Sequence, residues 1–168
     1  MTYHFQRGIR ADLPRVYELI DQRIHWMDEK GIRQWNVTDY WGCYPPAHYE
    51  RAVDMGCLYV LRQEGGVIVA VAVLWEEDER WHGDSATAYY VHHLTTALGE
   101  RGAGEIMLAE CYALARRQGK EFLRLDCAVD NPTLNAYYQR QGFEPAGQCV
   151  DGLYKGVLRQ KGTKKLRS

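Results

Sequence analysis

The glycine-rich segment at residues 99–104 most constrains how this chain can fold, because it leads directly into a stretch with helical periodicity. Three of its six residues are glycine, and apolar residues then recur at the spacing of one helix face as far as Leu114. A strand is predicted just before it, at about residues 86–96. A loop between a strand and a helix presents unpaired backbone N–H groups at the positive end of the helix dipole, which predicts a site for an anion such as phosphate.

Two common nucleotide-binding motifs do not fit this loop. No Gly-Lys-Ser/Thr follows the glycines, and no acidic residue ends a second parallel strand at the distance of a dinucleotide fingerprint. Asp126 lies near that distance, but inside a predicted strand and beyond an intervening helix. Glycines at a helix start also form tight turns without any ligand, so the loop alone leaves the phosphate site and the simple turn both open.

The order of the remaining segments predicts a mixed α/β domain. Asp12 and Asn131 are expected to cap the helices that follow them. We expect one domain over residues 1–161, with a partly antiparallel sheet flanked by helices, and a basic, flexible tail at 162–168. Expected helices cover about 12–30, 47–55, 104–119 and 131–142, and expected strands cover about 4–10, 57–62, 67–75, 86–96, 122–129 and two short pieces within 143–161.

The composition, with 46% hydrophobic and 26% charged residues, is that of a soluble globular protein. The longest apolar run, 67–75, has nine residues, whereas a helix needs about 20 to cross a bilayer, so no membrane span is predicted. No apolar leader precedes the first charges, and we expect a cytoplasmic protein. The five cysteines are widely spaced without a Cys-x-x-Cys pair, which argues against disulfides and against a bound metal.

The net charge of -1 hides an uneven distribution. Residues 1–151 hold 15 basic and 22 acidic side chains, a net charge of -7, whereas the charged residues after them are all basic. An acidic body argues against a nucleic-acid binder and agrees with a cationic ligand. A nucleic-acid-binding module remains as an alternative that would act through the basic end, namely Lys155, Arg159, Lys161, Lys164, Lys165 and Arg167.

Three ordered blocks carry a resemblance to a known family: LGERGAGEIML at 98–108, LRLDCAVDN at 123–131 and LNAYYQRQGF at 134–143. Together they resemble the core of the GNAT superfamily of acyl-CoA-dependent N-acetyltransferases, most specifically over residues 86–147. The resemblance implies a central parallel strand pair that splays apart. It places the pantetheine arm of acetyl-CoA in that gap and the pyrophosphate on the glycine loop.

The same resemblance implies which residues hold acetyl-CoA. Main-chain amides carry most of such a site, and Arg101 adds a positive charge. One departure stands at Gly99, where the family commonly has Arg or Gln. The implied coenzyme-binding residues are Leu94, Thr95, Thr96, Leu98, Gly99, Glu100, Arg101, Gly102, Ala103 and Gly104, together with Asn131 and Tyr138.

Acyl transfer to an amine needs a base for the ammonium, a donor for the oxyanion and a proton for the departing thiolate. The resemblance gives the last role to Tyr138, and a core packing role is the alternative. It also implies that a backbone N–H of Leu94 or Thr95 donates a hydrogen bond to the oxyanion. His92 and His93 are the candidate bases, with side chains expected on opposite strand faces, and a purely hydrogen-bonded strand histidine is the alternative for each.

The resemblance places the acceptor side in the aromatic stretch between His25 and Tyr49. Trp35 and Trp41 are the candidates for binding an apolar or cationic amine through their ring faces, although packing onto the sheet would also explain them. Glu76 is a further candidate for the acceptor and, with Glu77, an alternative base, while a solvated acidic turn is the other interpretation of this pair.

We therefore expect an N-acetyltransferase that moves an acetyl group from acetyl-CoA to a primary amine in a ternary complex, without a metal. The acceptor is a small molecule or a peptide, and the protein is a monomer or a homodimer. The alternative within the same fold is an acyl-CoA-binding sensor or partner module that has lost turnover.

Overall fold

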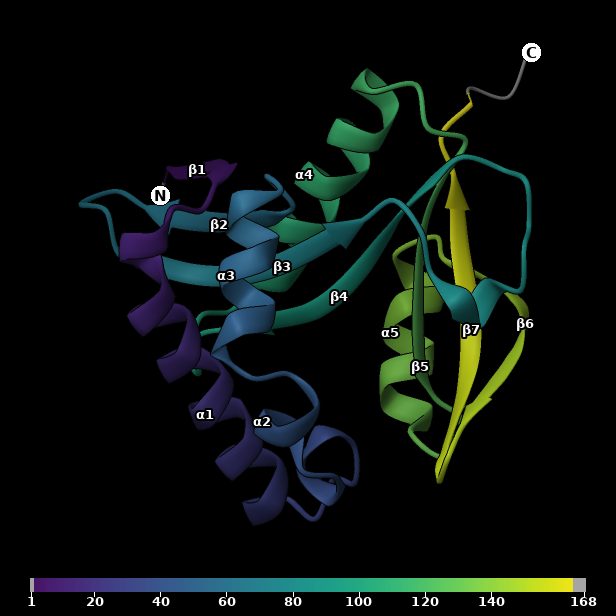
Figure 1. Ribbon diagram of the computed structural model, residues 1–168, viewed down its shortest axis with the longest axis horizontal. Coiled ribbons are helices and arrows are strands. Elements are labelled where there is room, and N and C mark those ends of the chain that lie inside the picture. The colour runs from purple at the N-terminus through teal and green to yellow at the C-terminus, as the bar shows by residue number, and fades with distance from the viewer. Residues whose placement is uncertain (1, 165–168) are drawn as a thin grey trace. The chain divides into compact units, whose positions relative to one another are not determined.

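The structure is a computed structural model that describes residues 2–164, whose strands form one mixed sheet in the order β1-β2-β3-β4-β5-β7-β6 (Figure 1). The strands are β1 (Tyr3–Arg7), β2 (Leu58–Gln63), β3 (Ile68–Trp75), β4 (Ala88–Thr96), β5 (Phe122–Ala128), β6 (Glu144–Asp151) and β7 (Tyr154–Gly162). The helices are α1 (Leu13–Glu29), α2 (Tyr40–Cys43), α3 (Pro46–Asp54), α4 (Ala103–Arg117) and α5 (Pro132–Arg140). The predicted mixed α/β class is confirmed, with β4 and β5 parallel and β1–β2, β2–β3, β5–β7 and β6–β7 antiparallel.

The chain divides into two compact units. Unit 1 comprises Met1–Leu74 and His93–Leu108, and unit 2 comprises Trp75–His92 and Ala109–Ser168. Strand β4 and helix α4 each contribute residues to both units. The expectation of one domain over 1–161 stays a prediction.

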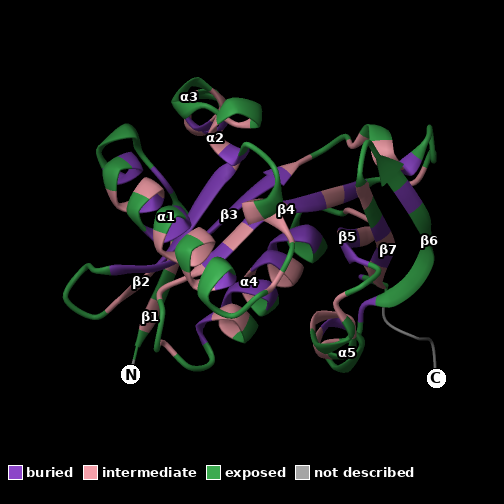
Figure 2. Ribbon diagram, turned by 90° about the horizontal axis from the view of Figure 1, so that it is seen from below, coloured by how far each residue is buried: buried purple, intermediate pink, exposed green. Residues whose placement is uncertain are grey.

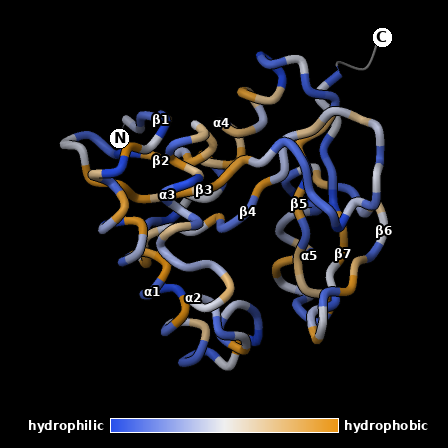
Figure 3. Tube along the Cα trace, in the orientation of Figure 1, coloured by the Kyte–Doolittle hydropathy of each residue, from blue (hydrophilic) through white to orange (hydrophobic). Residues whose placement is uncertain are grey.

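Strand β3 forms the centre of unit 1. Every residue from Ile68 to Leu74 is buried, and the strand is hydrophobic along its length (Figure 3). A strand covered on both faces has such a continuous apolar sequence. Helix α1 covers one face of the β1–β3 sheet and the first turns of α4 cover the other (Figure 2). Helix α1 buries Leu13, Val16, Leu19, Ile20 and Met27.

Asp12 does not cap α1 through its side chain, contrary to expectation. A short 3-10 turn at Arg10–Asp12 runs straight into α1, so the Asp12 backbone is already helical. The buried carboxylate instead accepts the Ile9 N–H at 2.9 Å and an Arg62 N–H at 2.6 Å. It therefore ties the chain entering α1 to β2.

In unit 2, the parallel pairing of β4 with β5 joins Ala88–Tyr90 to Phe122–Arg124, at the start of both strands. Different elements contact the two faces of β5. Cys127 contacts Asn135 of α5, whereas Arg124 and Asp126 contact the segment between β3 and β4. This follows from the alternation of side chains along a strand.

Arg124 is the largest fully buried side chain, at 1% exposure. Its guanidinium lies 4.3 Å from the centre of the Trp81 ring and 4.8 Å from that of Phe122. It donates to the Tyr90 hydroxyl at 3.0 Å and to Asp84 at 3.1 Å, and its Nε donates to Gln160. These contacts attach the segment between β3 and β4 to the sheet of unit 2.

No helix within residues 2–164 is long and apolar enough to cross a membrane. The five cysteines are free thiols, and Cys111, Cys127 and Cys149 are buried. Burial raises the pKa of the Cys111 thiol to about 12, so it stays protonated at neutral pH.

Candidate active site

The glycine-rich loop connects β4 to α4 within unit 1. Its start is fixed by the Ala97 N–H, which donates to Val69 of β3 at 2.8 Å. Gly99 and Gly102 have φ of 84° and 83°, in the left-handed region, and a Cβ on either would meet no atom within 4 Å. Backbone conformation therefore requires glycine at these two positions, and the space beside them is open. Helix α4 begins directly afterwards, at Ala103.

Strand β4 is distorted at His93, whose φ of 57° is rare for a residue other than glycine. The residue is buried, and its carbonyl accepts the Thr95 hydroxyl at 3.0 Å. A left-handed residue inside a strand is typical of a bulge, which interrupts the regular hydrogen-bond ladder. The distortion lies directly before Leu94 and Thr95, the two residues expected to provide the oxyanion N–H.

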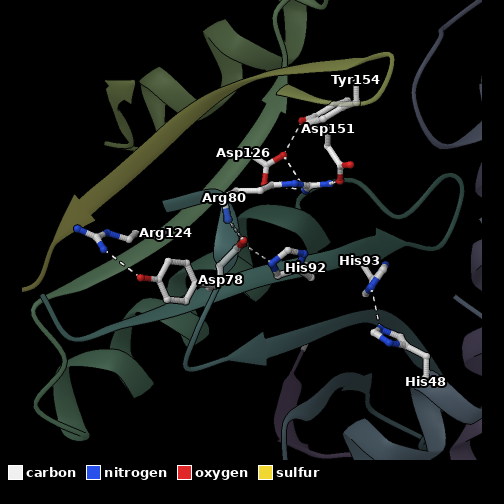
Figure 4. Close-up of polar contacts among 10 residues, drawn as sticks. His48, Asp78, Arg80, His92, His93, Arg124, Asp126, Asp151 and Tyr154 are labelled. Atoms are coloured by element: carbon white, nitrogen blue, oxygen red, sulfur yellow. Dashed lines mark hydrogen bonds and ion pairs between the residues drawn. The ribbon is translucent and has the colours of Figure 1, made fainter. Parts of the chain in front are cut away.

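His93 and His92 make separate sets of contacts. The His93 Nδ1 lies 2.7 Å from the Tyr40 hydroxyl. Figure 4 shows the other side of the ring, where Nε2 of His93 lies 3.1 Å from Nε2 of His48. The Tyr40 hydroxyl also bonds to that of Tyr49. The Tyr44 ring packs edge-on against His93, with centroids 4.5 Å apart. His93 thus belongs to a buried aromatic cluster in unit 1.

His92 belongs to unit 2, where its Nε2 lies 2.7 Å from an oxygen of Asp78 (Figure 4). Asp78 also accepts the backbone N–H of Arg80 at 2.9 Å. The Arg80 guanidinium in turn pairs with Asp126 and Asp151, at 3.4 Å and 3.0 Å. This chain of contacts holds His92 against the segment between β3 and β4.

Burial alone would raise the pKa of Asp78, but the hydrogen bond from His92 and the positive charges of His92 and Arg80 outweigh it and lower that pKa. A carboxyl group whose pKa is lowered in the folded state stabilises the protein at pH values above its ordinary pKa of about 4. This stabilisation is lost as the pH falls through the folded-state pKa. We predict that Asp78→Asn lowers Tm by about 3–6 °C near pH 6, and that the difference from wild type narrows as the pH falls below about 4.

Thermal melts monitored by circular dichroism across this pH range test the prediction. Glu79→Gln, which removes an exposed carboxylate from the same segment, is the matched control and should leave Tm nearly unchanged. A difference in Tm between Asp78→Asn and wild type that is the same at every pH would contradict a lowered pKa of Asp78 in the folded protein.

Tyr138 lies on α5 in unit 2, at 9% exposure, with its ring edge-on to Phe143 at 6.0 Å between centroids. Within residues 2–164 its hydroxyl has no hydrogen-bond partner. Burial raises the pKa of Tyr138 above its ordinary value of about 10, so the phenol carries its proton at neutral pH. Helix α5 begins after Asn131, which accepts the Leu134 N–H at 3.0 Å, so the predicted cap is confirmed.

Asn135 and Arg159 hold α5 in place, and neither was expected to do so from the sequence. The Asn135 amide donates to the carbonyls of Ala128 and Asn131, and its oxygen accepts from Arg159 at 3.1 Å. Arg159 also donates to the Phe143 carbonyl at 2.9 Å. Arg159 is buried in β7, so its inclusion in the basic end of the nucleic-acid-binding alternative was wrong. Lys165 and Arg167 lie outside the described residues.

The expected acceptor residues fall into two places. Trp35 and Trp41 are half-buried in unit 1, beside the Tyr40 ring at 5.5 Å and 5.3 Å, and Trp41 donates to Asp21 at 2.8 Å. Glu76 is an exposed residue of unit 2 that pairs with Lys120 at 2.6 Å. The tryptophans thus belong to the His93 cluster, whereas Glu76 already has a surface ion-pair partner.

Arg23 contacts the end of β4, and this contact was not predicted from the sequence. From α1 it donates to both the carbonyl and the hydroxyl of Thr96 at 3.0 Å, and its guanidinium lies over the Trp26 ring. It therefore fixes the strand end from which the glycine loop starts. Among residues 2–164 no three histidine, cysteine or acidic side chains form a group that would bind a metal.

Comparison with known proteins agrees with this architecture. The chain is 25% identical over 164 residues to the uncharacterized N-acetyltransferase YesJ of Bacillus subtilis, covering 84% of this chain and 85% of that protein. A solved acetyltransferase of the GNAT family from Listeria monocytogenes shares the fold, with a TM-score of 0.80, 23% identity and coverage of 95% and 94%. The PaiA N-acetyltransferase of Thermoplasma acidophilum, in complex with coenzyme A, does so with a TM-score of 0.73, 14% identity and coverage of 96% and 99%.

The family model of the Acetyltransferase (GNAT) family matches residues 20–143. That span includes the aromatic cluster of unit 1, the distorted strand β4, the glycine loop and the helix that carries Tyr138. Since the match covers most of the sequence and the fold agrees with solved members, the chain belongs to the GNAT family of acetyltransferases.

Proposed function

We propose that this protein transfers an acetyl group from acetyl-CoA directly to a primary amine in a ternary complex. The proposal is carried by the glycine loop, whose left-handed Gly99 and Gly102 leave open space at the start of a 15-residue helix. Backbone N–H groups there suit the pyrophosphate of coenzyme A. Exposed Arg101 adds a positive charge to the same loop. The coenzyme A bound to the PaiA enzyme supports an acyl-CoA as the donor.

In the proposed reaction the neutral amine nitrogen attacks the thioester carbonyl carbon. The C–N bond forms, and the oxyanion of the intermediate accepts a backbone N–H of Leu94 or Thr95, beside the distortion at His93. The C–S bond then breaks, and the thiolate of coenzyme A takes a proton from the Tyr138 hydroxyl. The proton that the new amide nitrogen loses returns to the Tyr138 phenolate through water, so the balance is one amide and one free thiol. Tyr138 suits this role because its phenol is protonated at neutral pH and no other residue in the described chain binds its hydroxyl.

The acceptor is proposed to be a cationic amine that lies against the half-buried aromatic rings of unit 1, with Trp35 and Trp41 as the first candidates. Aromatic ring faces attract ammonium groups, and residues 1–151 are acidic overall. Glu76 is exposed and is proposed to contribute only to attracting such a cation.

The proposal is tested by measuring free thiol released from acetyl-CoA across a panel of amines, amino acid derivatives and short peptides. Thiol release that depends on one class of amine, with the acetylated product found by mass spectrometry, is the expected result. Thermal stabilisation by coenzyme A without thiol release from any amine would instead support the acyl-CoA-binding module without turnover.

The loop itself is tested by Gly102→Ala. A left-handed alanine costs about 1–2 kcal/mol, and its methyl group would occupy the space proposed for the phosphates, so we expect the Kd for coenzyme A to rise by about tenfold or more. Gly65→Ala is the matched control, because Gly65 has φ of 96° and equally open surroundings in the hairpin between β2 and β3. Equal Kd values for the two variants would contradict the loop assignment.

A further inference from the structure

Arg23 of α1 holds a positive charge at the end of β4 without a negative partner. Its Nη2 donates to the carbonyl and to the hydroxyl oxygen of Thr96, both at 3.0 Å, and its guanidinium lies 4.8 Å from the centre of the Trp26 ring. These three partner groups are all neutral. Among the residues that the structure describes, 2–164, no carboxylate pairs with Arg23 and no acceptor binds its Nε or Nη1. The guanidinium therefore keeps N–H donors and its whole charge for a further partner.

This charge is not fully hydrated. Arg23 and Thr96 are both half-buried. Burial lowers the pKa of Arg23 below its ordinary value, because water stabilises the charge less here than at an exposed position. An arginine stays protonated at neutral pH despite such a shift. A half-buried cation without a counter-ion is unfavourable, which favours an anion beside it.

The side chains of the glycine loop supply no net positive charge for an anion. Residues 97–105 hold one basic side chain, Arg101, and two acidic ones, Glu100 and Glu105, which gives a net charge of -1. The loop contributes its backbone N–H groups and the positive end of the α4 dipole. Arg23, which comes from a different element, cancels this negative charge.

Arg23 is also close to the loop. Thr96 precedes Leu98, the first residue of the proposed phosphate site, by two residues, which span at most about 7 Å. Arg23, Thr96 and the loop all belong to unit 1. The Thr96 hydroxyl accepts from Arg23, so its own hydrogen can be donated to the same anion. The planar guanidinium matches the geometry of phosphate and carboxylate groups.

We propose that Arg23, together with the Thr96 hydroxyl, binds an oxyanion group of one of the two reactants. This rests on the proposed function. The phosphates of coenzyme A are the expected source, because Arg23 adjoins the loop that is proposed to hold them. A carboxylate on the amine acceptor would supply the same chemistry, since α1 leads into the aromatic stretch that contains Trp35.

The test compares Arg23→Gln with wild type. The Kd for coenzyme A, measured by calorimetry, should rise by about tenfold or more, because a hydrogen bond to a charged group is lost. The dependence of this Kd on salt concentration should weaken, because one attractive charge is removed. With an amine that lacks a carboxylate, thiol release from acetyl-pantetheine, which has no phosphates, should proceed at the wild-type rate.

A second arm distinguishes the source of the oxyanion. If the acceptor supplies it, the Kd for coenzyme A stays unchanged in Arg23→Gln. The KM then rises by about tenfold or more for amines that carry a carboxylate, but not for their methyl esters. Either pattern supports an oxyanion site at Arg23.

Arg15→Gln is the matched control. Arg15 is another arginine of α1 that donates to a strand carbonyl, that of Ile68 at 3.2 Å, but it already pairs with Glu18. Its Kd and KM values should equal those of wild type. If Arg23→Gln fails to fold, Arg23→Lys decides, because it keeps the charge without the planar fork. A rise of severalfold in either constant then supports the site, and unchanged constants overturn it.

Equal Kd and KM values in Arg23→Gln and Arg15→Gln overturn the proposal. So does a rate with acetyl-pantetheine that falls as far as the rate with acetyl-CoA, because Arg23 would then only hold the end of β4. Wild-type protein that neither binds coenzyme A nor releases thiol overturns the proposed function. Active wild type with fully active Arg23→Gln overturns only the role of Arg23.

Discussion

Replacing Tyr138 by phenylalanine is expected to lower kcat for acetyl transfer by about 100-fold or more while leaving the fold intact. The substitution removes only the hydroxyl, and the ring keeps its edge-on contact with Phe143 at 6.0 Å between centroids. Without that proton the thiolate of coenzyme A must leave as an anion. Steady-state thiol release, together with the melting temperature of the variant, measures the effect.

Tyr137→Phe is the control for this prediction, because the neighbouring tyrosine is half-buried on the same helix and is not proposed to donate a proton. It should keep kcat within about twofold of wild type. A Tyr138→Phe variant with unchanged kcat would show that another group protonates the thiolate and that Tyr138 serves only to pack α5.

The substitution Arg124→Met is expected to reduce the free energy of unfolding by about 3 kcal/mol and Tm by about 6–12 °C. Methionine keeps part of the apolar stem but leaves the Tyr90 hydroxyl and Gln160 without their buried partner. It also removes the cation that lies over the Trp81 and Phe122 rings. The loss stays near the low end for a buried ion pair because Asp84 is 43% exposed and remains hydrated.

Urea unfolding followed by tryptophan fluorescence and circular dichroism measures this difference. Arg116→Met, at an exposed position of α4, is the matched control and should change stability by less than about 0.5 kcal/mol. Equal stability of the two variants would contradict a structural role for the buried guanidinium.

The fold was predictable from the sequence where local chemistry decides it. Helix α5 begins at the Asn131 cap and stops before Gly142, which has φ of 92°, and both features are visible in the sequence. The burial of β3 on both faces follows from its unbroken apolar run. A turn at the glycine loop was also predictable, since glycine readily adopts the left-handed backbone that the structure has at Gly102.

The parts that sequence reasoning missed depend on contacts between distant positions. His48 and His93 are 45 residues apart, and nothing near either one indicates the other. Helix α2 has only four residues, too few for a periodic pattern. Arg159 was grouped with the basic end because its charge is visible in the sequence, whereas its burial against Asn135 and Phe143 depends on how β7 and α5 meet. Buried charges of this kind follow from the tertiary structure.

The left-handed backbone at His93 has a consequence for how this enzyme can diverge. Among residues with a side chain, histidine, asparagine and aspartate adopt φ near 57° most readily, whereas valine, isoleucine and threonine, the usual residues of a strand, do not. Homologous sequences that keep this distortion are therefore restricted at position 93 to those residues or glycine. In a survey of such sequences, the residue type at position 93 would therefore indicate whether β4 is distorted, even where no structure exists. A β-branched residue at this position would indicate that the strand is regular there.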